Sequence, residues 1–250
     1  MTRGLPTPPA DVHLALPAAT LAGSKAVLIG SGFATRTAHE ALAALGADVV
    51  FSDAADPGEA ARWVGAADAD ILVLGATLSP PRPAEDIGPA DWRDGPGREL
   101  ATAFAVLSAF GARRGERGGV ALVLLDPVAL LGGPGVSAAA AAHAGLVNLA
   151  QSLAVEWAPR DIRVNALAVG RFEGGDSFGG LPGNIPALRL GQARELGWMV
   201  SYLCSPFAAY VTGTCVTIDG GDSLRRNLLE PRYSPGEFLA TATSPAAQIV

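Results

Sequence analysis

Short, continuous apolar runs alternate along this chain with longer stretches that are rich in alanine and leucine. Runs that lack a polar residue at every second position are typical of parallel strands buried on both faces. We therefore expect strands at Ala26–Ile29, Asp48–Phe51, Ile71–Leu74, Val120–Leu125, Arg163–Leu167 and Thr214–Ile218. The stretches between them predict helices at Thr37–Leu45, Leu100–Gly111, Ser137–Trp157 and Ala193–Leu203. This alternation predicts an α/β fold in which helices flank a doubly wound parallel sheet.

The two ends of the chain depart from this pattern. Residues 1–20 contain four prolines and no basic-then-apolar arrangement, so they predict an arm rather than a targeting sequence. Residues 223–250 carry further prolines and predict a second arm, which either contacts a neighbouring subunit or is disordered. A single domain is expected between the two arms, over residues 21–222.

Composition argues against several classes of function. Apolar residues make up 49% of the chain and charged residues 17%, which suits a large core and further surface buried between subunits. The net charge of -6 argues against a nucleic-acid partner, which would need a basic face. The most apolar run, Val120–Leu131, is broken by Asp126 and Pro127 and is too short to cross a bilayer. With two cysteines that read as core residues, the protein is expected to be cytoplasmic, with no membrane contact.

Several stretches resemble the short-chain dehydrogenase/reductase family, and they follow one another in the family's order. They are similar to its first strand and cofactor turn, its fourth strand, its central helix, its sixth strand, and its last strand with an Asp-Gly-Gly turn. In chain order these stretches are Leu21–Gly30, Asp70–Ala76, His143–Trp157, Ile162–Ala168 and Tyr210–Gly221. The resemblance implies a Rossmann-like domain over most of the chain.

The turn that holds a dinucleotide in that family is altered here. The family uses three spaced glycines, so that backbone N–H groups and a helix N-terminus can approach the pyrophosphate. This chain keeps Gly30 and Gly32, places Phe33 and Thr35 where the second and third glycines belong, and is one residue short. A phenyl ring would occupy phosphate volume, and Thr35 adds a Cβ where the helix must pack tightly. We expect no bound dinucleotide, with a small anion at the helix N-terminus as the alternative.

The connection between the second and third expected strands is short. Asp48–Gly75 spans 28 residues, and one βαβ unit needs about 30, so there is room for one crossover. The family has an extra strand and helix at this point. The sequence therefore predicts that the edge strand next to the adenine site is missing, and Asp53 is interpreted as a turn residue rather than a ribose ligand.

The catalytic positions of the family are altered as well. Its members use an asparagine, a serine, a tyrosine that transfers a proton, and a lysine that lowers the pKa of the tyrosine and holds the ribose. Asp91–Phe104 resembles the helix that carries the asparagine. Counting along the matched helices, these four positions hold Glu99, Asp126, Ala139 and His143. An alanine methyl cannot donate a proton, so the resemblance implies a degenerate member with no catalytic residue and no cofactor of its own.

Other interpretations stay open. Asp126, Glu99 and His143 could form an acid–base site of their own, because the ordinary pKa of histidine, about 6.5, suits proton transfer. A lone histidine on an alanine-rich helix is more often a hydrogen-bonded structural residue. A further interpretation is that the protein is a homo-oligomeric ligand-binding or regulatory protein. No metal site is expected, since the other histidines, His13 and His39, lie in distant segments.

The segments that form subunit interfaces in the family are retained. Leu100–Gly111 and Ser137–Trp157 match one interface, and Arg189–Leu203 with Val211–Asp219 matches the other. A chain that keeps its docking surfaces without its chemistry is expected to be a non-catalytic subunit, in a heterotetramer with a homologous active subunit that binds NAD. It resembles in this respect the degenerate subunit of the dehydrogenase for 2-[hydroxy(phenyl)methyl]succinyl-CoA in anaerobic toluene degradation. A substrate of the 3-hydroxyacyl-CoA type is the corresponding expectation.

Overall fold

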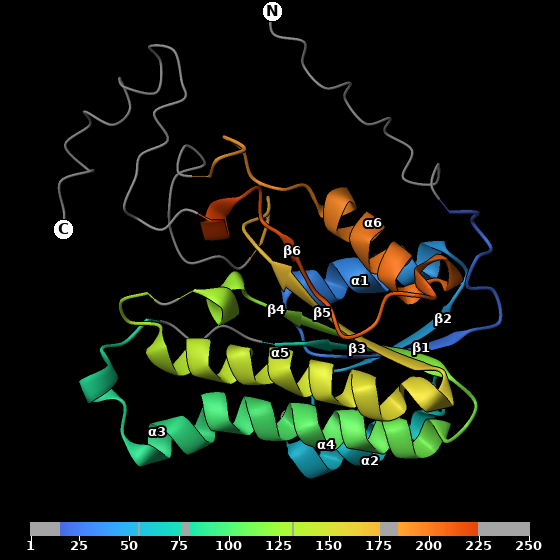
Figure 1. Cartoon of the computed structure of the whole chain (residues 1–250), viewed down its shortest axis with the longest axis horizontal. Coiled ribbons are helices and arrows are strands. Elements are labelled where there is room, and N and C mark those ends of the chain that lie inside the picture. The colour runs from blue at the N-terminus through green and yellow to red at the C-terminus, as the bar shows by residue number, and fades with distance from the viewer. Residues whose placement is uncertain (1–15, 55, 77–80, 132, 176–184, 225–250) are drawn as a thin grey trace, which may run out of the picture.

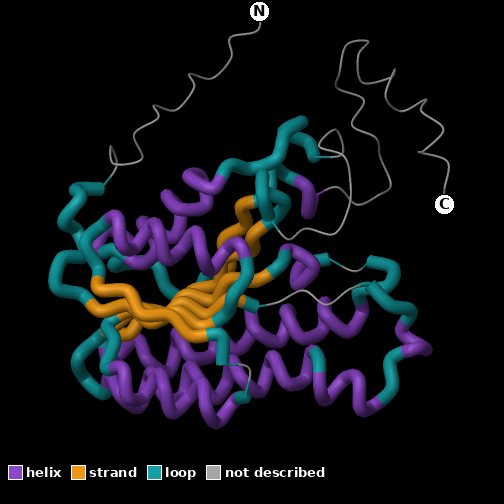
Figure 2. Tube along the Cα trace, turned by 180° about the vertical axis from the view of Figure 1, so that it is seen from behind, coloured by secondary structure: helices purple, strands orange, loops and turns teal. Residues whose placement is uncertain are grey.

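The computed structural model describes residues 16–54, 56–76, 81–131, 133–175 and 185–224. These residues form one parallel sheet with the strand order β2-β1-β3-β4-β5-β6, enclosed between two layers of helices (Figures 1 and 2). The strands are β1 (Lys25–Ile29), β2 (Asp48–Ser52), β3 (Ile71–Gly75), β4 (Gly119–Leu125), β5 (Ile162–Val169) and β6 (Cys215–Ile218). All six expected strands are confirmed, and so is the doubly wound α/β architecture.

The helices divide between the two faces of the sheet. One face carries α1 (Phe33–Ala44) and α6 (Ala193–Cys204), and the other carries α2 (Pro57–Ala67), α4 (Pro96–Arg114) and α5 (Ser137–Trp157) (Figure 1). Each layer has its own apolar core, because the four central strands bury side chains on both faces. The expected helix Ser137–Trp157 is confirmed with the same bounds.

Helix α5 is long and apolar enough to cross a membrane by length and composition alone. Its apolar character has another explanation in this fold, because α5 packs against β5 and α4 and buries residues such as Leu146 and Trp157. The two helices are in tight contact at Gly111 of α4, where a Cβ would lie 2.4 Å from the Trp157 ring. The alanines of α5 therefore serve a tightly packed helix layer.

Two sequence-based helix bounds were wrong. Helix α1 begins at Phe33 rather than at Thr37, because Gly32 provides an extended N-cap and Thr35 turns into the core instead of remaining in a loop. The stretch Asp91–Phe104 is not one helix: α3 (Pro89–Asp94) ends at Gly95, and α4 begins with the next residue. Gly95 has φ -114° and ψ -108°, and a Cβ there would lie 2.9 Å from the carbonyl oxygen of Asp91.

The single crossover between β2 and β3 is confirmed. Helix α2 fills it, with Asp56 as N-cap accepting a hydrogen bond from the N–H of Glu59 at 2.8 Å and Pro57 at the first helical position. The sheet ends at β2, which pairs with β1 alone among the described strands. The predicted absence of the outer edge strand is therefore also confirmed for the part of the chain that the structure describes.

The predicted arms lie largely outside the described residues. Of the N-terminal arm the structure describes residues 16–20, and Leu16 is buried against the core beneath α1 and α6. Of the C-terminal arm it describes residues 223 and 224, in the short helix η7 (Asp222–Leu224). The predicted arm boundaries, at residues 20 and 223, therefore remain predictions.

Candidate functional site

The turn from β1 into α1 lies at the carboxyl edge of the sheet, between β1 and β3. After β1 the chain forms β2 on one side of β1, and it then crosses back to form β3 on the other side. The carboxyl edge between β1 and β3 is therefore the topological switch point, where open α/β sheets bind ligands. Gly30 has φ +109°, and a Cβ there would lie 2.8 Å from the carbonyl oxygen of Gly75. Gly32 is the N-cap of α1 and supplies no side-chain cap. The turn thus consists of three residues, 30–32.

Thr35 fills the space between these strand ends. Its side chain is buried, with 1% of the residue exposed, and a Cβ on Gly75 would lie only 2.1 Å from Thr35 Oγ1. Gly30 meets the same oxygen, since a Cβ there would be 3.4 Å from it. The threonine that replaces the expected third glycine is therefore packed directly against the end of β3.

Phe33 packs on an aromatic residue from the other side of the switch point. Its ring centroid lies 5.9 Å from that of Phe172, with 34° between the ring planes. Phe172 follows β5 and is 4% exposed, and a Cβ on Gly175 would contact Phe33 at 3.6 Å. The first turn of α1 and the loop after β5 are thus joined by an aromatic contact.

The arginine nearest this turn is already engaged. Arg36 donates from its guanidinium to the carbonyl oxygen of Ser31 at 2.7 Å, and so braces the turn itself. Asp53, which follows β2, is exposed and is followed within a few residues by α2. The structure places Asp53 beside the open edge of the sheet.

Three of the altered catalytic positions come together at the end of β4. His143 is fully buried on α5, and its Nδ1 accepts a hydrogen bond from the backbone N–H of Asp126 at 3.1 Å. Its Nε2 lies 3.3 Å from Oε2 of Glu99, a distance suited to an ion pair, although the contact is not aligned as a hydrogen bond. The sequence grouped these three residues, and the structure brings them into contact.

The contacts of His143 fix its protonation pattern. Because Nδ1 accepts a hydrogen bond from a backbone amide, the neutral ring carries its own proton on Nε2, toward the Glu99 carboxylate. Neither ring nitrogen then has a free lone pair to accept a proton from a substrate. With 0% of the residue exposed, the imidazole is placed to link β4, α4 and α5.

Asp126 caps a short helix with its side chain. Its Oδ1 accepts a hydrogen bond from the N–H of Val128 at 2.8 Å, at the start of η3 (Pro127–Leu130). Burial raises the pKa of the Asp126 carboxyl above its ordinary value, and the nearby charge of Asp222 acts in the same direction. Asp222 itself is paired with Arg171 at 3.0 Å. This carboxyl therefore has a structural task and is harder to ionise than an exposed one.

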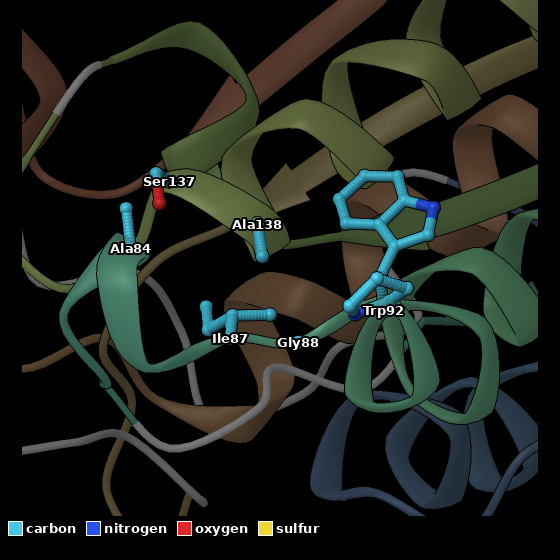
Figure 3. A pocket seen from close by; sticks show the side chains of 7 residues that line it. Ala84, Ile87, Gly88, Trp92, Ser137 and Ala138 are labelled. Atoms are coloured by element: carbon cyan, nitrogen blue, oxygen red, sulfur yellow. The ribbon is translucent and has the colours of Figure 1, made fainter.

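Ala139, at the expected tyrosine position, is buried with 6% exposed. Directly before it on the helix, at Ser137 and Ala138, a hollow of about 350 Å³ opens between the start of α5 and the segment that leads into α3 (Figure 3). Trp92, Ile87 and Ala138 surround it, and the hydroxyl of Ser137 is a polar group at its wall (Figure 3). Sequence reasoning did not single out this hollow, because its lining residues are apolar or small and belong to three separate elements.

No three His, Cys, Asp or Glu side chains gather as a metal site anywhere in the described ranges. The thiol of Cys204 is buried on α6, and burial raises its pKa to about 12. Cys215 on β6 is half-buried, and burial raises its pKa too. Neither thiol is set up as a nucleophile, because only the thiolate is reactive.

Comparison with known proteins gives a consistent family assignment. Residues 17–223 match the family model described as enoyl-(acyl carrier protein) reductase. The 3-oxoacyl-[acyl-carrier-protein] reductase FabG of Escherichia coli is 33% identical over 162 residues, which cover 62% of this chain and 66% of that enzyme. The chain therefore matches just under two thirds of the length of this relative.

Solved structures show the same fold. A structure named as an NAD(P)-dependent gluconate 5-dehydrogenase from Beutenbergia cavernae, with bound NADP at low occupancy, is 27% identical with a TM-score of 0.75. The match covers 82% of this chain and 98% of that one. The citronellol catabolism dehydrogenase AtuB of Pseudomonas aeruginosa is 25% identical with a TM-score of 0.72, covering 84% and 98%. The chain is thus similar in architecture to both of these proteins.

Proposed function

Because this chain belongs to the short-chain dehydrogenase/reductase family, we propose that it is a non-catalytic member, which assembles with an active NAD-dependent subunit of the same family. The observation that carries the proposal is the packing of Thr35 against Gly75 at the switch point. A phosphate group that approached the turn would need the volume that the side chains of Thr35 and Phe33 occupy. The cofactor is then held by the partner subunit alone.

The arrangement at the catalytic positions supports the same proposal. The side chain of Ala139 has no proton to transfer, and Nδ1 of His143 already accepts a hydrogen bond from the backbone N–H of Asp126. The carboxyl of Asp126 caps η3. The polar groups of His143 and Asp126 therefore hold β4, α5 and η3 together, as a subunit retained for assembly requires.

The outer surface of α4 and α5 supports assembly through that face. Phe104 of α4 is 58% exposed and Val155 of α5 is 79% exposed, far more than apolar side chains of a core helix. Between them the two helices present mainly small or uncharged residues to solvent, such as Ala101, Ala144 and Asn148. A surface depleted of charge, with an aromatic residue near its middle, is typical of subunit interfaces.

The proposal assigns a substrate class only to the assembled enzyme, and not to this chain alone. Some of the relatives are named for acyl chains carried by a protein or by CoA, among them the 3-oxoacyl-[acyl-carrier-protein] reductase FabG of Escherichia coli and a probable 2,4-dienoyl-CoA reductase of Bacillus subtilis. A 3-hydroxyacyl-CoA-type substrate, as in the dehydrogenase for 2-[hydroxy(phenyl)methyl]succinyl-CoA, is the specific form of the proposal. The active subunit would carry out the hydride transfer in a heterotetramer.

The test is co-expression with the short-chain dehydrogenase encoded nearest to this chain, with an affinity tag on this chain alone. The expected result is a mixed oligomer with NAD bound in a ratio of one per partner subunit. Phe104→Arg should abolish the mixed oligomer, whereas Phe51→Arg, at a residue that is 46% exposed on β2 and outside both interface segments, should not. A homogeneous oligomer of this chain with bound NAD(H) would overturn the proposal.

A second candidate is an enzyme that uses Asp126, Glu99 and His143 for acid–base chemistry. The 3.3 Å approach of His143 Nε2 to Glu99 favours it, since it is a carboxylate–imidazole pair at the carboxyl edge of the sheet. It predicts that Glu99→Gln abolishes turnover of some substrate while the melting temperature stays the same. The non-catalytic proposal predicts that Glu99→Gln leaves the activity of the co-expressed complex unchanged.

A further inference from the structure

A cavity of about 140 Å³ lies at the carboxyl ends of β5 and β6. Its walls come from the loop that follows β5, the end of β6 with the turn after it, the segment that leads into α6, and the first turn of α6. None of the four altered catalytic positions lines it. The carboxyl ends of parallel strands are the usual place for ligands in open α/β sheets, so this cavity is a candidate binding site.

Apolar side chains form part of the wall. Phe172, which is 4% exposed, and Ile218, the last residue of β6, both line the cavity. Ala187 lines it from the segment before α6. A wall of this kind favours a ligand that buries apolar surface against it.

The charged side chains that line the cavity are paired within the protein. Arg189 donates to both carboxylate oxygens of Glu195, at 2.8 and 2.6 Å. Arg171 pairs with Asp222 at 3.0 Å, and the carboxylate of Asp219 accepts from the backbone N–H groups of residues 221 and 223 at 2.8 and 2.7 Å. An ionic ligand would have to leave water and compete with these partners for its own counter-charge. The charges therefore favour an uncharged ligand.

The ring of Phe172 limits the size of the cavity. A Cβ on Gly191 would lie 2.5 Å from this ring, and Phe33 contacts it with the ring centroids 5.9 Å apart. Backbone hydrogen bonds of 2.9 and 3.0 Å join Gly191 to the residues on either side of Phe172, so the backbone that carries the ring is held as well. Cavities of about 150 Å³ are large enough for one benzene ring. The space thus suits a molecule with one ring and excludes one with two.

We propose that this cavity binds a flat, uncharged aromatic molecule that has one ring and a polar substituent, and that Phe172 sets the limit of one ring. The ring lies against Phe172 and Ile218, and the planar guanidinium of Arg189 offers a further flat group, which favours an aromatic ligand over an aliphatic one. The substituent lies toward the ion pair of Arg189 and Glu195, on the side open to solvent, because 56% of the Arg189 side chain is exposed. The site is separate from the exposed face of α4 and α5, so it does not depend on the proposed active partner.

Calorimetric titration of the chain made alone tests the chemistry of the ligand, with phenol as the probe. We expect phenol to saturate one site per chain, and benzoate and cyclohexanol to bind at least about tenfold more weakly, because one is charged and the other is not flat. Ile218→Phe should abolish the binding of phenol by filling the cavity. Thr217→Phe is the matched control, at the preceding, exposed residue of β6, and should leave it unchanged. No saturable binding of phenol, or equal binding in these two variants, would overturn the proposal.

A second titration, with indole as a two-ring probe, tests the role of Phe172. Phe172→Ala should bind indole at least about tenfold more tightly than the parent, because the volume of the lost ring joins the cavity. Phe110→Ala, at a residue 1% exposed in the other helix layer, opens the volume of one ring and should not bind indole. Phe172→Leu should show a smaller gain than Phe172→Ala, and it decides the question if the alanine variant does not fold.

The volume of the lost ring can also be refilled from the opposite wall. In the Phe172→Ala background, Gly191→Leu should reverse the gain in indole binding, because a side chain at residue 191 enters the space that the ring occupied. An equal affinity for indole in the parent and the Phe172 variants would overturn the proposal. So would a gain that Phe110→Ala matches or that Gly191→Leu does not reverse.

Discussion

The imidazole of His143 and the backbone of Asp126 are joined by a hydrogen bond of 3.1 Å from the amide N–H to Nδ1. This bond holds the end of β4 to the first half of α5. It also makes the histidine a structural acceptor at a position where the family has a lysine that contacts cofactor.

His143→Ala should therefore lower the free energy of unfolding by about 2–4 kcal/mol, because it creates a cavity and leaves a buried N–H without a partner. Urea unfolding followed by circular dichroism measures the loss. His39→Ala, at an exposed residue of α1, is the control and should change stability by less than about 0.5 kcal/mol. An unchanged stability for His143→Ala would show that the hydrogen bond contributes nothing to the fold.

The contact between Thr35 and Gly75 can be tested by a double-mutant cycle. Gly75→Ala alone should destabilise the protein by about 1–3 kcal/mol, since its Cβ would lie 2.1 Å from Thr35 Oγ1. In a Thr35→Ala background that oxygen is gone, and the same change should cost much less. Chemical denaturation of the four proteins gives the coupling energy. Gly65→Ala in α2, where a Cβ meets nothing within 4 Å, should be neutral or stabilising. Additive losses at 35 and 75 would refute the packing.

Asp126→Asn should stabilise the protein near neutral pH. The folded-state pKa of this carboxyl lies above its ordinary value of 3.8, so its favourable contribution is complete below that pH and is lost as the pH rises through the folded pKa. An asparagine stays neutral and its Oδ1 can still accept from Val128. The melting temperature of the variant should match the parent near pH about 4 and exceed it at pH about 7. Asp48→Asn, at an exposed site, should show no such trend, and a variant less stable than the parent at pH 7 would contradict the prediction.

Arg163 offers a test of how the C-terminal end of α6 is held. Its guanidinium donates to the carbonyl oxygens of Leu203, Ser205 and Val211 at 2.9, 3.1 and 3.3 Å from a buried position on β5. Arg163→Lys should cost about 2–4 kcal/mol, since a single ammonium cannot serve carbonyls spread across this planar fork. Thermal unfolding checks this, with Arg98→Lys in an exposed i,i+4 pair as the control. A loss equal to that of the control would mean that the three contacts are dispensable.

Much of this fold could be predicted from apolar patterning. Buried parallel strands leave continuous apolar runs such as Val120–Leu125, so their existence and order followed from the sequence. The start of α1 could not be predicted, because Thr35 and Arg36 resemble loop residues and only tertiary packing takes Thr35 into the core. The break at Gly95 depends on a backbone conformation that a sequence pattern does not specify.

The residues of the candidate site could be predicted from the sequence, but their contacts could not. Counting along the helices placed Glu99, Asp126 and His143 in one group, and the structure has them in contact. Which nitrogen of His143 accepts, and from which amide, depends on the distance between β4 and α5. The contact of Phe33 with Phe172 joins residues that are far apart in the chain, and no local pattern signals it.

The direct connection from β2 through α2 to β3 limits how this protein could be redesigned. Glycines at positions 33 and 35 would reopen the turn, yet the sheet would still stop where an adenosine needs a wall. An engineered cofactor site therefore begins with a graft of backbone, a strand and a helix inserted after β2.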